Sequence, residues 1–67
     1  MNDKKLCNHL NRIAYKSCMS DYIITGDRND IYDYWLLLIE LKRNCEAEGV
    51  QKALEFIDLI EELNGKN

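Results

Sequence analysis

The sequence predicts an all-α protein, a small antiparallel three-helix bundle. Proline is absent and only three glycines occur, whereas a β fold of short strands needs frequent turn residues. Apolar residues recur at spacings of three and four, the period of a helix with one buried face. The 67 residues form a single domain, residues 1–67, close to the size at which one core is only marginally stabilising.

The first predicted helix covers residues 3–22 and has one apolar side. Asn2 or Asp3 can cap its start, and we expect it to fray after Asp21 and to end before Gly26. Its apolar stripe is expected to face the core and comprises Leu6, Cys7, Leu10, Ile13, Ala14, Ser17 and Cys18.

The second predicted helix, residues 30–44, is apolar almost all round. Nine of the eleven residues from Ile31 to Leu41 are apolar or aromatic, and such a helix is normally buried. Asp27, Asn29 or Asp30 can cap its start. Because two short neighbours cannot enclose this helix, we expect a bundle organised around it and completed by a second chain.

The third predicted helix covers residues 49–64 and ends before Gly65. The second helix can stop near Asn44 or near Gly49, or it can continue through Gly49 at a cost of about 1 kcal/mol relative to alanine. We prefer a break between Asn44 and Gly49. A core stripe is formed by Val50, Ala53, Leu54, Ile57 and Ile60, and it is broadened by Phe56, Leu59 and Leu63. This helix, too, has more apolar surface than one face requires.

The cysteines predict buried thiols rather than a disulfide framework or a metal site. Their number is three, which is odd, and no apolar leader segment is recognised at the N-terminus, so we expect reduced thiols in a cytoplasmic protein. Cys7 and Cys18 share a helix face but lie about 16 Å apart along its axis, and Cys45 is left unplaced. We therefore expect no metal and no cofactor.

No motif in the sequence indicates catalysis. His9 is the only histidine, and neither a nucleophile motif nor a phosphate-binding glycine loop is present. The longest apolar run, Tyr34 to Ile39, is far shorter than the roughly twenty residues that cross a bilayer. We therefore expect no enzyme, no small-molecule substrate and no membrane partner.

Charge is distributed unevenly along the chain, whose formal net charge is −3. Residues 1–20 carry four basic groups and one acidic group, and residues 46–67 carry two basic and six acidic groups. Four basic side chains lie on one flank of the first helix, named here the basic flank: Lys5, His9, Arg12 and Lys16. Such a flank can follow a phosphate backbone, so a nucleic-acid-binding regulator is the alternative function. The net negative charge and the apolar helix after the first turn argue against it.

The surplus of apolar surface favours a non-enzymatic protein-interaction module, such as a small regulator, inhibitor, chaperone or adaptor. It would act by helix-to-helix docking, as a homodimer or with a larger protein partner. A third interpretation is an autonomous monomer that buries the surplus internally. The predicted interface residues lie on the second and third helices: Tyr32, Trp35, Leu36, Leu37, Ile39, Phe56, Leu59 and Leu63.

Overall fold

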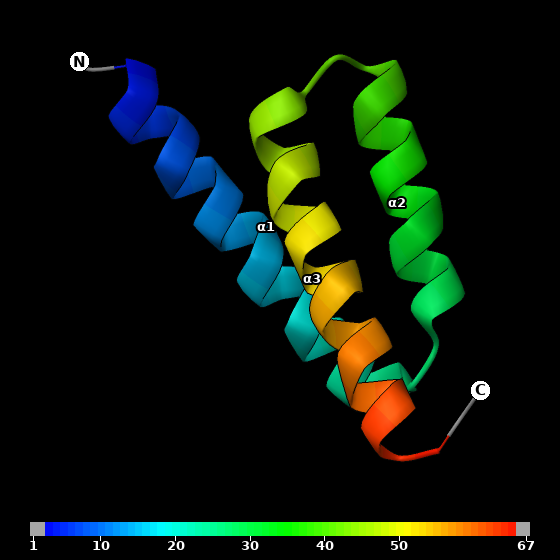
Figure 1. Cartoon of the computed structure of the whole chain (residues 1–67). Helices are drawn as coiled ribbons and strands as arrows, with labels where there is room; N and C mark the ends of the chain where they lie inside the picture. The colour runs from blue at the N-terminus through cyan, green and yellow to red at the C-terminus, as the bar shows by residue number, and fades with distance from the viewer. Residues whose placement is uncertain (1–2, 66–67) are drawn as a thin grey trace.

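A computed structural model describes residues 3–65. Within that range the chain forms α1 (Asp3–Thr25), α2 (Arg28–Glu40) and α3 (Asn44–Leu63), without strands. Successive helices run in opposite directions, so that α1 and α3 point the same way (Figure 1). The predicted all-α, antiparallel three-helix fold is therefore confirmed. Asn2, one of the two expected caps of α1, lies outside the described residues, and Asp3 is the first helical residue.

The turn between α1 and α2 has the expected residues in the expected roles. Gly26 has a φ of 68°, and its N–H donates to the Tyr22 carbonyl at 2.7 Å, as a residue that closes a helix does. The Asp27 carboxylate accepts a hydrogen bond from the Asn29 N–H at 2.8 Å and caps α2. The predicted bounds were wrong by a few residues, since α1 continues without fraying to Thr25 and α2 begins at Arg28 rather than at residue 30.

The break between α2 and α3 falls earlier than predicted. The Arg43 N–H donates to the Leu38 carbonyl at 2.9 Å, and the Lys42 N–H donates to the Ile39 carbonyl at 3.0 Å. Together with a φ of 61° at Lys42, these bonds form a Schellman motif. A lysine occupies the position that glycine usually takes, so the sequence carries no glycine signal there. The predicted break between the two helices is therefore present, but its predicted position between Asn44 and Gly49 is wrong, and Gly49 lies inside α3.

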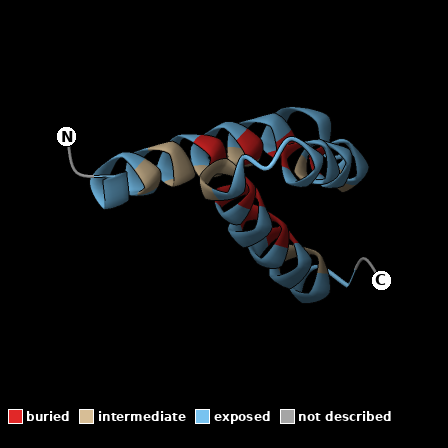
Figure 2. Cartoon of the chain, turned by 90° about the horizontal axis from the view of Figure 1, so that it is seen from above, coloured by how far each residue is buried: buried red, intermediate tan, exposed pale blue. Residues whose placement is uncertain are grey.

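The core lies along α3, and the expectation that the bundle is organised around the second helix is wrong. α1 and α2 both pack mainly on α3 and meet each other only sparingly. Buried residues follow the inner side of α3, where the other two helices meet it (Figure 2). The buried core consists of Ala14, Cys18, Tyr22, Ile31, Leu38, Ala47, Val50, Ala53, Leu54 and Ile57. Small residues suit α3 to the central position: Ala47 and Ala53 are buried, and Gly49 allows the close approach of α1.

α1 approaches α3 so closely that backbone touches backbone. A Cβ built on Gly49 would overlap the carbonyl oxygen of Asn11 and lie 2.9 Å from its carbonyl carbon. This contact places Asn11, Ala14 and Cys18 toward α3, and it turns part of the predicted apolar stripe outward. Leu6 and Ile13 are 43% and 51% exposed, so their expected core position is wrong.

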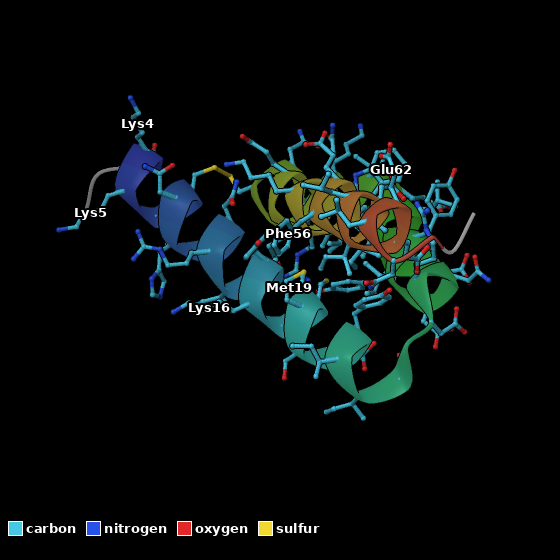
Figure 3. The ribbon with its side chains drawn as sticks, turned by 60° about the horizontal axis from the view of Figure 1, so that its bottom comes forward. Lys4, Lys5, Lys16, Met19, Phe56 and Glu62 are labelled. Atoms are coloured by element: carbon cyan, nitrogen blue, oxygen red, sulfur yellow. A yellow bond between two sulfur atoms is a disulfide. The ribbon has the colours of Figure 1, made fainter. Side chains whose placement is uncertain are left out.

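Cys7 and Cys45 form a disulfide with a Cα–Cα distance of 5.1 Å, drawn as the yellow bond between α1 and α3 in Figure 3. The expectation of three reduced thiols is therefore wrong for two of them, and only Cys18 is a free, buried cysteine. The pairing arises because α1 and α3 run in the same direction, which brings their first turns together. Periodicity within one helix cannot reveal a pair that is 38 residues apart.

Candidate protein-interaction surface

α2 buries one narrow ridge and exposes the residues on both sides of it. Only Ile31 and Leu38 are fully buried, while six large apolar residues are 39–55% exposed. At about 100° per residue they fall into two flanks. The outer flank consists of Tyr32, Leu36 and Ile39, and the inner flank consists of Tyr34, Leu37 and Leu41.

Trp35 lies between the buried ridge and the outer flank. It is half-buried and packs against the core, and its ring stacks with that of Tyr32 at a centroid distance of 5.8 Å. Its indole N–H is buried without a hydrogen-bond partner in the described part of the chain. The aromatic pair therefore forms a firm base for the outer flank, since both rings are held by contacts within the chain.

The exposed apolar residues of α3 face away from α2. Phe56, Leu59 and Leu63 are 45–79% exposed. Lys52, one helical turn before Phe56 on the same side, lines a cavity together with residues of α1, whereas Asp58 forms an ion pair with Arg28 of α2. The eight predicted interface residues thus lie on separate sides of the molecule and do not form one continuous surface.

A small pocket of about 170 Å³ lies where α1 and α2 meet. It is lined by Ser17, Cys18, Asp21, Asp30, Ile31 and Tyr34. Four further apolar residues are exposed and were not predicted as interface residues: Leu6 and Ile13 of α1, Tyr34 of α2, and Leu41, which caps the end of α2. The helical spacing of Leu6, Leu10 and Ile13 marks an apolar ridge, but spacing alone does not show whether a ridge faces the core or the solvent.

The four residues of the basic flank of α1 are exposed. Lys5, His9 and Arg12, with Asn8, surround a shallow cavity of about 260 Å³, while Lys16 lies outside this lining. Figure 3 shows Lys5 and Lys16 on the side of α1 that faces solvent. Among the described residues, the ion pairs Arg28–Asp58 and Arg43–Glu46 include none of the four basic-flank residues.

A second shallow cavity, of about 390 Å³, separates the basic flank from α3. Its lining is polar and consists of Asn8, Asn11, Arg12, Tyr15, Glu48 and Lys52. Side chains of both charges line this cavity around the Asn11–Gly49 contact. Ligand sites are usually lined by apolar side chains, so this cavity is better described as a polar groove between two packed helices.

Two side chains of the core, Cys18 and Tyr22, have raised pKa values. Burial, followed by the nearby Asp21 carboxylate, raises the pKa of the Cys18 thiol. The hydrogen bond that the Tyr22 hydroxyl donates to Glu61 Oε2 at 2.8 Å raises the pKa of Tyr22, and burial adds to this effect. A high pKa suppresses the thiolate, which is the reactive form of cysteine.

Residues 3–65 contain neither a metal-binding cluster nor a membrane-spanning helix. No group of three or more His, Cys, Asp and Glu side chains is placed to hold a metal ion. In the same range, no helix combines the length and the apolarity required to cross a bilayer.

Both flanks of α2 expose large apolar side chains. Comparison of the chain with protein-family models, with curated proteins and with solved structures found no match.

Proposed function

We propose that this chain is a protein–protein interaction module that acts by helix-to-helix docking through α2 and performs no catalysis. One observation carries the proposal: a helix of 13 residues buries only Ile31 and Leu38 and exposes apolar side chains on both flanks. Scattered single apolar residues are ordinary on protein surfaces, but contiguous patches mark interaction sites.

The residue types on α2 support this interpretation. Tyrosine and tryptophan are enriched in protein interfaces because they combine a large apolar area with a polar tip. The Tyr32–Trp35 stack is already ordered, which lowers the entropic cost of binding. Polar residues border the flanks, with Asp33 and Glu40 both exposed, as at the rim of a typical interface.

The cytoplasmic location expected from the cysteines loses its support. Disulfides persist mainly in oxidising compartments, and the Cys7–Cys45 bond joins the two helices that form most of the core. The disulfide therefore favours an oxidising compartment as the location of this chain.

The proposal is tested by charging both flanks of α2 in the variant Leu36→Glu/Leu37→Glu. These side chains are 44% and 49% exposed, so we expect helicity by circular dichroism to be retained. Association between copies of the chain is measured by light scattering after gel filtration over a wide range of concentrations, and we expect it to be lost. Association that is unchanged in this variant would contradict the proposal.

The matched control is Ile23→Glu/Leu63→Glu, which adds the same two charges at sites that are 78% and 79% exposed. Neither residue lies on α2, so association should persist. Association lost in the control but kept in the α2 variant would instead place the interface on α1 and α3.

A second candidate function rests on the basic flank, where Lys5, His9 and Arg12 surround one cavity. Phosphate contacts by such residues make nucleic-acid binding steeply dependent on salt. Binding to duplex DNA or RNA that weakens with salt and disappears in Lys5→Glu/Arg12→Glu/Lys16→Glu would establish this function. Docking through apolar surface would be far less sensitive to salt.

A further inference from the structure

The Cys7–Cys45 disulfide joins α1 to α3 outside the buried core of the bundle. Both cysteines are half-buried rather than enclosed, and their sequence neighbours Leu6, Asn8 and Asn44 are exposed. Exchange of a disulfide with another thiol requires that the attacking thiolate can reach one of the two sulfur atoms. The partial exposure of both residues therefore leaves this bond open to a small thiol while the chain is folded.

The two cysteines occupy different positions in their helices. Cys45 is the second residue of α3, whereas Cys7 is the fifth residue of α1. The first N–H groups of a helix have no partner within it and carry a partial positive charge. Arg43, the N-cap residue of α3, supplies no side-chain cap to these groups. They therefore stabilise a thiolate at Cys45, and Cys7 gains less from α1 because the effect falls off within the first turn.

The carboxylates closest to Cys45 on α3 do not cancel this effect. Glu46 is engaged by Arg43, whose guanidinium donates to it at 2.7 and 2.9 Å. Glu48 lines the polar groove that also contains Arg12 of α1. Negative charge near Cys45 is thus accompanied by positive charge.

The charges beside Cys7 favour neither state of its sulfur. Asp3 and Lys4, about one turn before Cys7 on α1, have opposite signs. The difference between the two cysteines therefore comes from the start of α3, and it makes Cys45 the better leaving group, because a thiol of lower pKa leaves faster.

The attacking thiol must come from outside the folded chain. Cys18 is the free cysteine, and it is buried. Burial and the nearby Asp21 carboxylate raise its pKa, which keeps it in the unreactive thiol form. It also lies eleven residues after Cys7, about 16 Å along α1 at 1.5 Å per residue.

We propose that Cys7 is a thiolation site, at which a small external thiol attacks Cys7 Sγ in the folded chain and Cys45 leaves as the thiolate. A new S–S bond joins Cys7 to the incoming thiol, and the Cys7–Cys45 bond breaks with its electron pair on Cys45 Sγ. Cys45 then takes up the proton that the attacking thiol released. The protein disulfide is itself the oxidant, so the step needs no other reagent.

This exchange unties the first turns of α1 from α3. The backbone contact between Asn11 and Gly49 still holds α1 from Asn11 onward, and the core residues Ala14 and Cys18 lie beyond it. Thiolation of Cys7 therefore loosens one end of the bundle and leaves the remainder packed. The inference does not rest on docking through α2.

The first test uses reduced glutathione as the thiol. Oxidised protein is incubated with it at neutral pH, quenched with acid at successive early times and mapped by peptide mass spectrometry. We expect adducts on Cys7 to exceed those on Cys45 by about two- to fivefold, the size of a helix-terminus effect on a partly exposed group, with none on Cys18. Equal amounts on both cysteines, or an excess on Cys45, would overturn the proposal.

A matched pair of variants tests the cause of the preference. Asn44 and Asn8 are both exposed, and each adjoins one cysteine of the pair. Asn44→Asp places a negative charge beside Cys45, so the preference for Cys7 should fall toward equality. Asn8→Asp places the same charge beside Cys7 and should not lower the preference. An unchanged preference in Asn44→Asp would remove the start of α3 as its cause and overturn the assignment of Cys45 as leaving group.

The last test asks whether the folded chain reacts. The rate of adduct formation is measured in wild type at urea concentrations below the unfolding transition. We expect the rate to stay nearly constant, because the attacked sulfur is reached without opening the bundle. A rate that climbs steeply with urea would mean that surface must first be exposed by unfolding, and it would overturn the proposal.

Discussion

Gly49 is the residue on which the closest helix contact depends. In an exposed helix, replacing glycine by alanine stabilises by about 1 kcal/mol. Here the added Cβ would overlap the backbone of Asn11, and backbone cannot move aside as a flexible side chain can. The position that looked like a helix breaker in the sequence is instead a packing requirement.

We therefore predict that Gly49→Ala lowers the free energy of unfolding by about 1–3 kcal/mol, the usual cost of overpacking. Urea unfolding followed by circular dichroism measures the change. The control is Glu48→Ala at the exposed neighbouring position, which should alter stability by no more than about 0.5 kcal/mol. A Gly49→Ala protein that is more stable than the wild type would show that α1 can shift without cost.

Lys42 is a non-glycine residue held at a φ of 61°. A side chain in this left-handed region costs about 1–2 kcal/mol, and glycine avoids the cost. Part of this gain is offset, because glycine has more conformational freedom in the unfolded chain. We therefore predict that Lys42→Gly raises the free energy of unfolding by no more than about 1 kcal/mol. Lys42→Ala, which keeps the Cβ, should give no such gain in the same urea titration.

The sequence predicted individual buried residues well where one ridge dominates a helix. On α3, Val50, Ala53, Leu54 and Ile57 are buried as their spacing indicated. The sequence did not predict the role of a residue where that role depends on a contact with a residue distant in the chain. Nothing near Cys7 indicates Cys45, and nothing near Gly49 indicates Asn11, because both partners are supplied by the packing of α1 on α3.

At the scale of the helix, α1 shows why periodicity leaves rotation undetermined. It has two adjacent ridges of suitable residues, one through Ala14 and Cys18 and another through Leu6 and Ile13, and both have helical spacing. The ridge through Ala14 and Cys18 faces the core because only its smaller side chains allow the close approach of α1 to Gly49. Leu6 and Ile13 are therefore exposed although their spacing predicted a place in the core.

The first turns of α1 depend on the disulfide. Between Asp3 and Leu10, only Cys7 and Leu10 are half-buried, and the other side chains are exposed. Closing a loop between residues 38 apart stabilises by about 4 kcal/mol in the chain-entropy model. We predict that reduction, or the variant Cys7→Ser/Cys45→Ser, lowers the urea midpoint strongly and reduces helicity first in α1.

Cys18→Ala provides the control for that experiment, because Cys18 is the free cysteine. Its unfolding should remain sensitive to reductant, whereas the Cys7→Ser/Cys45→Ser variant should be indifferent to reductant. Equal stability of the oxidised and reduced wild type would contradict the prediction.

For the molecule as a whole, alkaline pH should be destabilising. The pKa values of Cys18 and Tyr22 lie above their ordinary values of 9.0 and 10.0 in the folded chain. The unfolded chain therefore loses these protons first, and stability falls as pH rises above about 9. Below that pH both groups are protonated in either state and have no effect on the pH dependence.

We predict that urea midpoints decline above about pH 9 and that Tyr22→Phe and Cys18→Ala each reduce the slope. The measurement is made on oxidised protein and kept brief, because thiolate formation at Cys18 allows disulfide exchange. If both variants kept the alkaline slope of the wild type, other groups would have to cause the decline.

The disulfide also determines how the chain would respond to a protease. The exposed turn at Gly26 and Asp27 lies between Cys7 and Cys45, so a single cut there leaves α1 covalently attached to α3. The cleaved protein would migrate as one species in electrophoresis without reductant and as two fragments with it. A molecule that is clipped at this turn therefore keeps its covalent unity and most of its core, and loses α1 only when the disulfide is reduced.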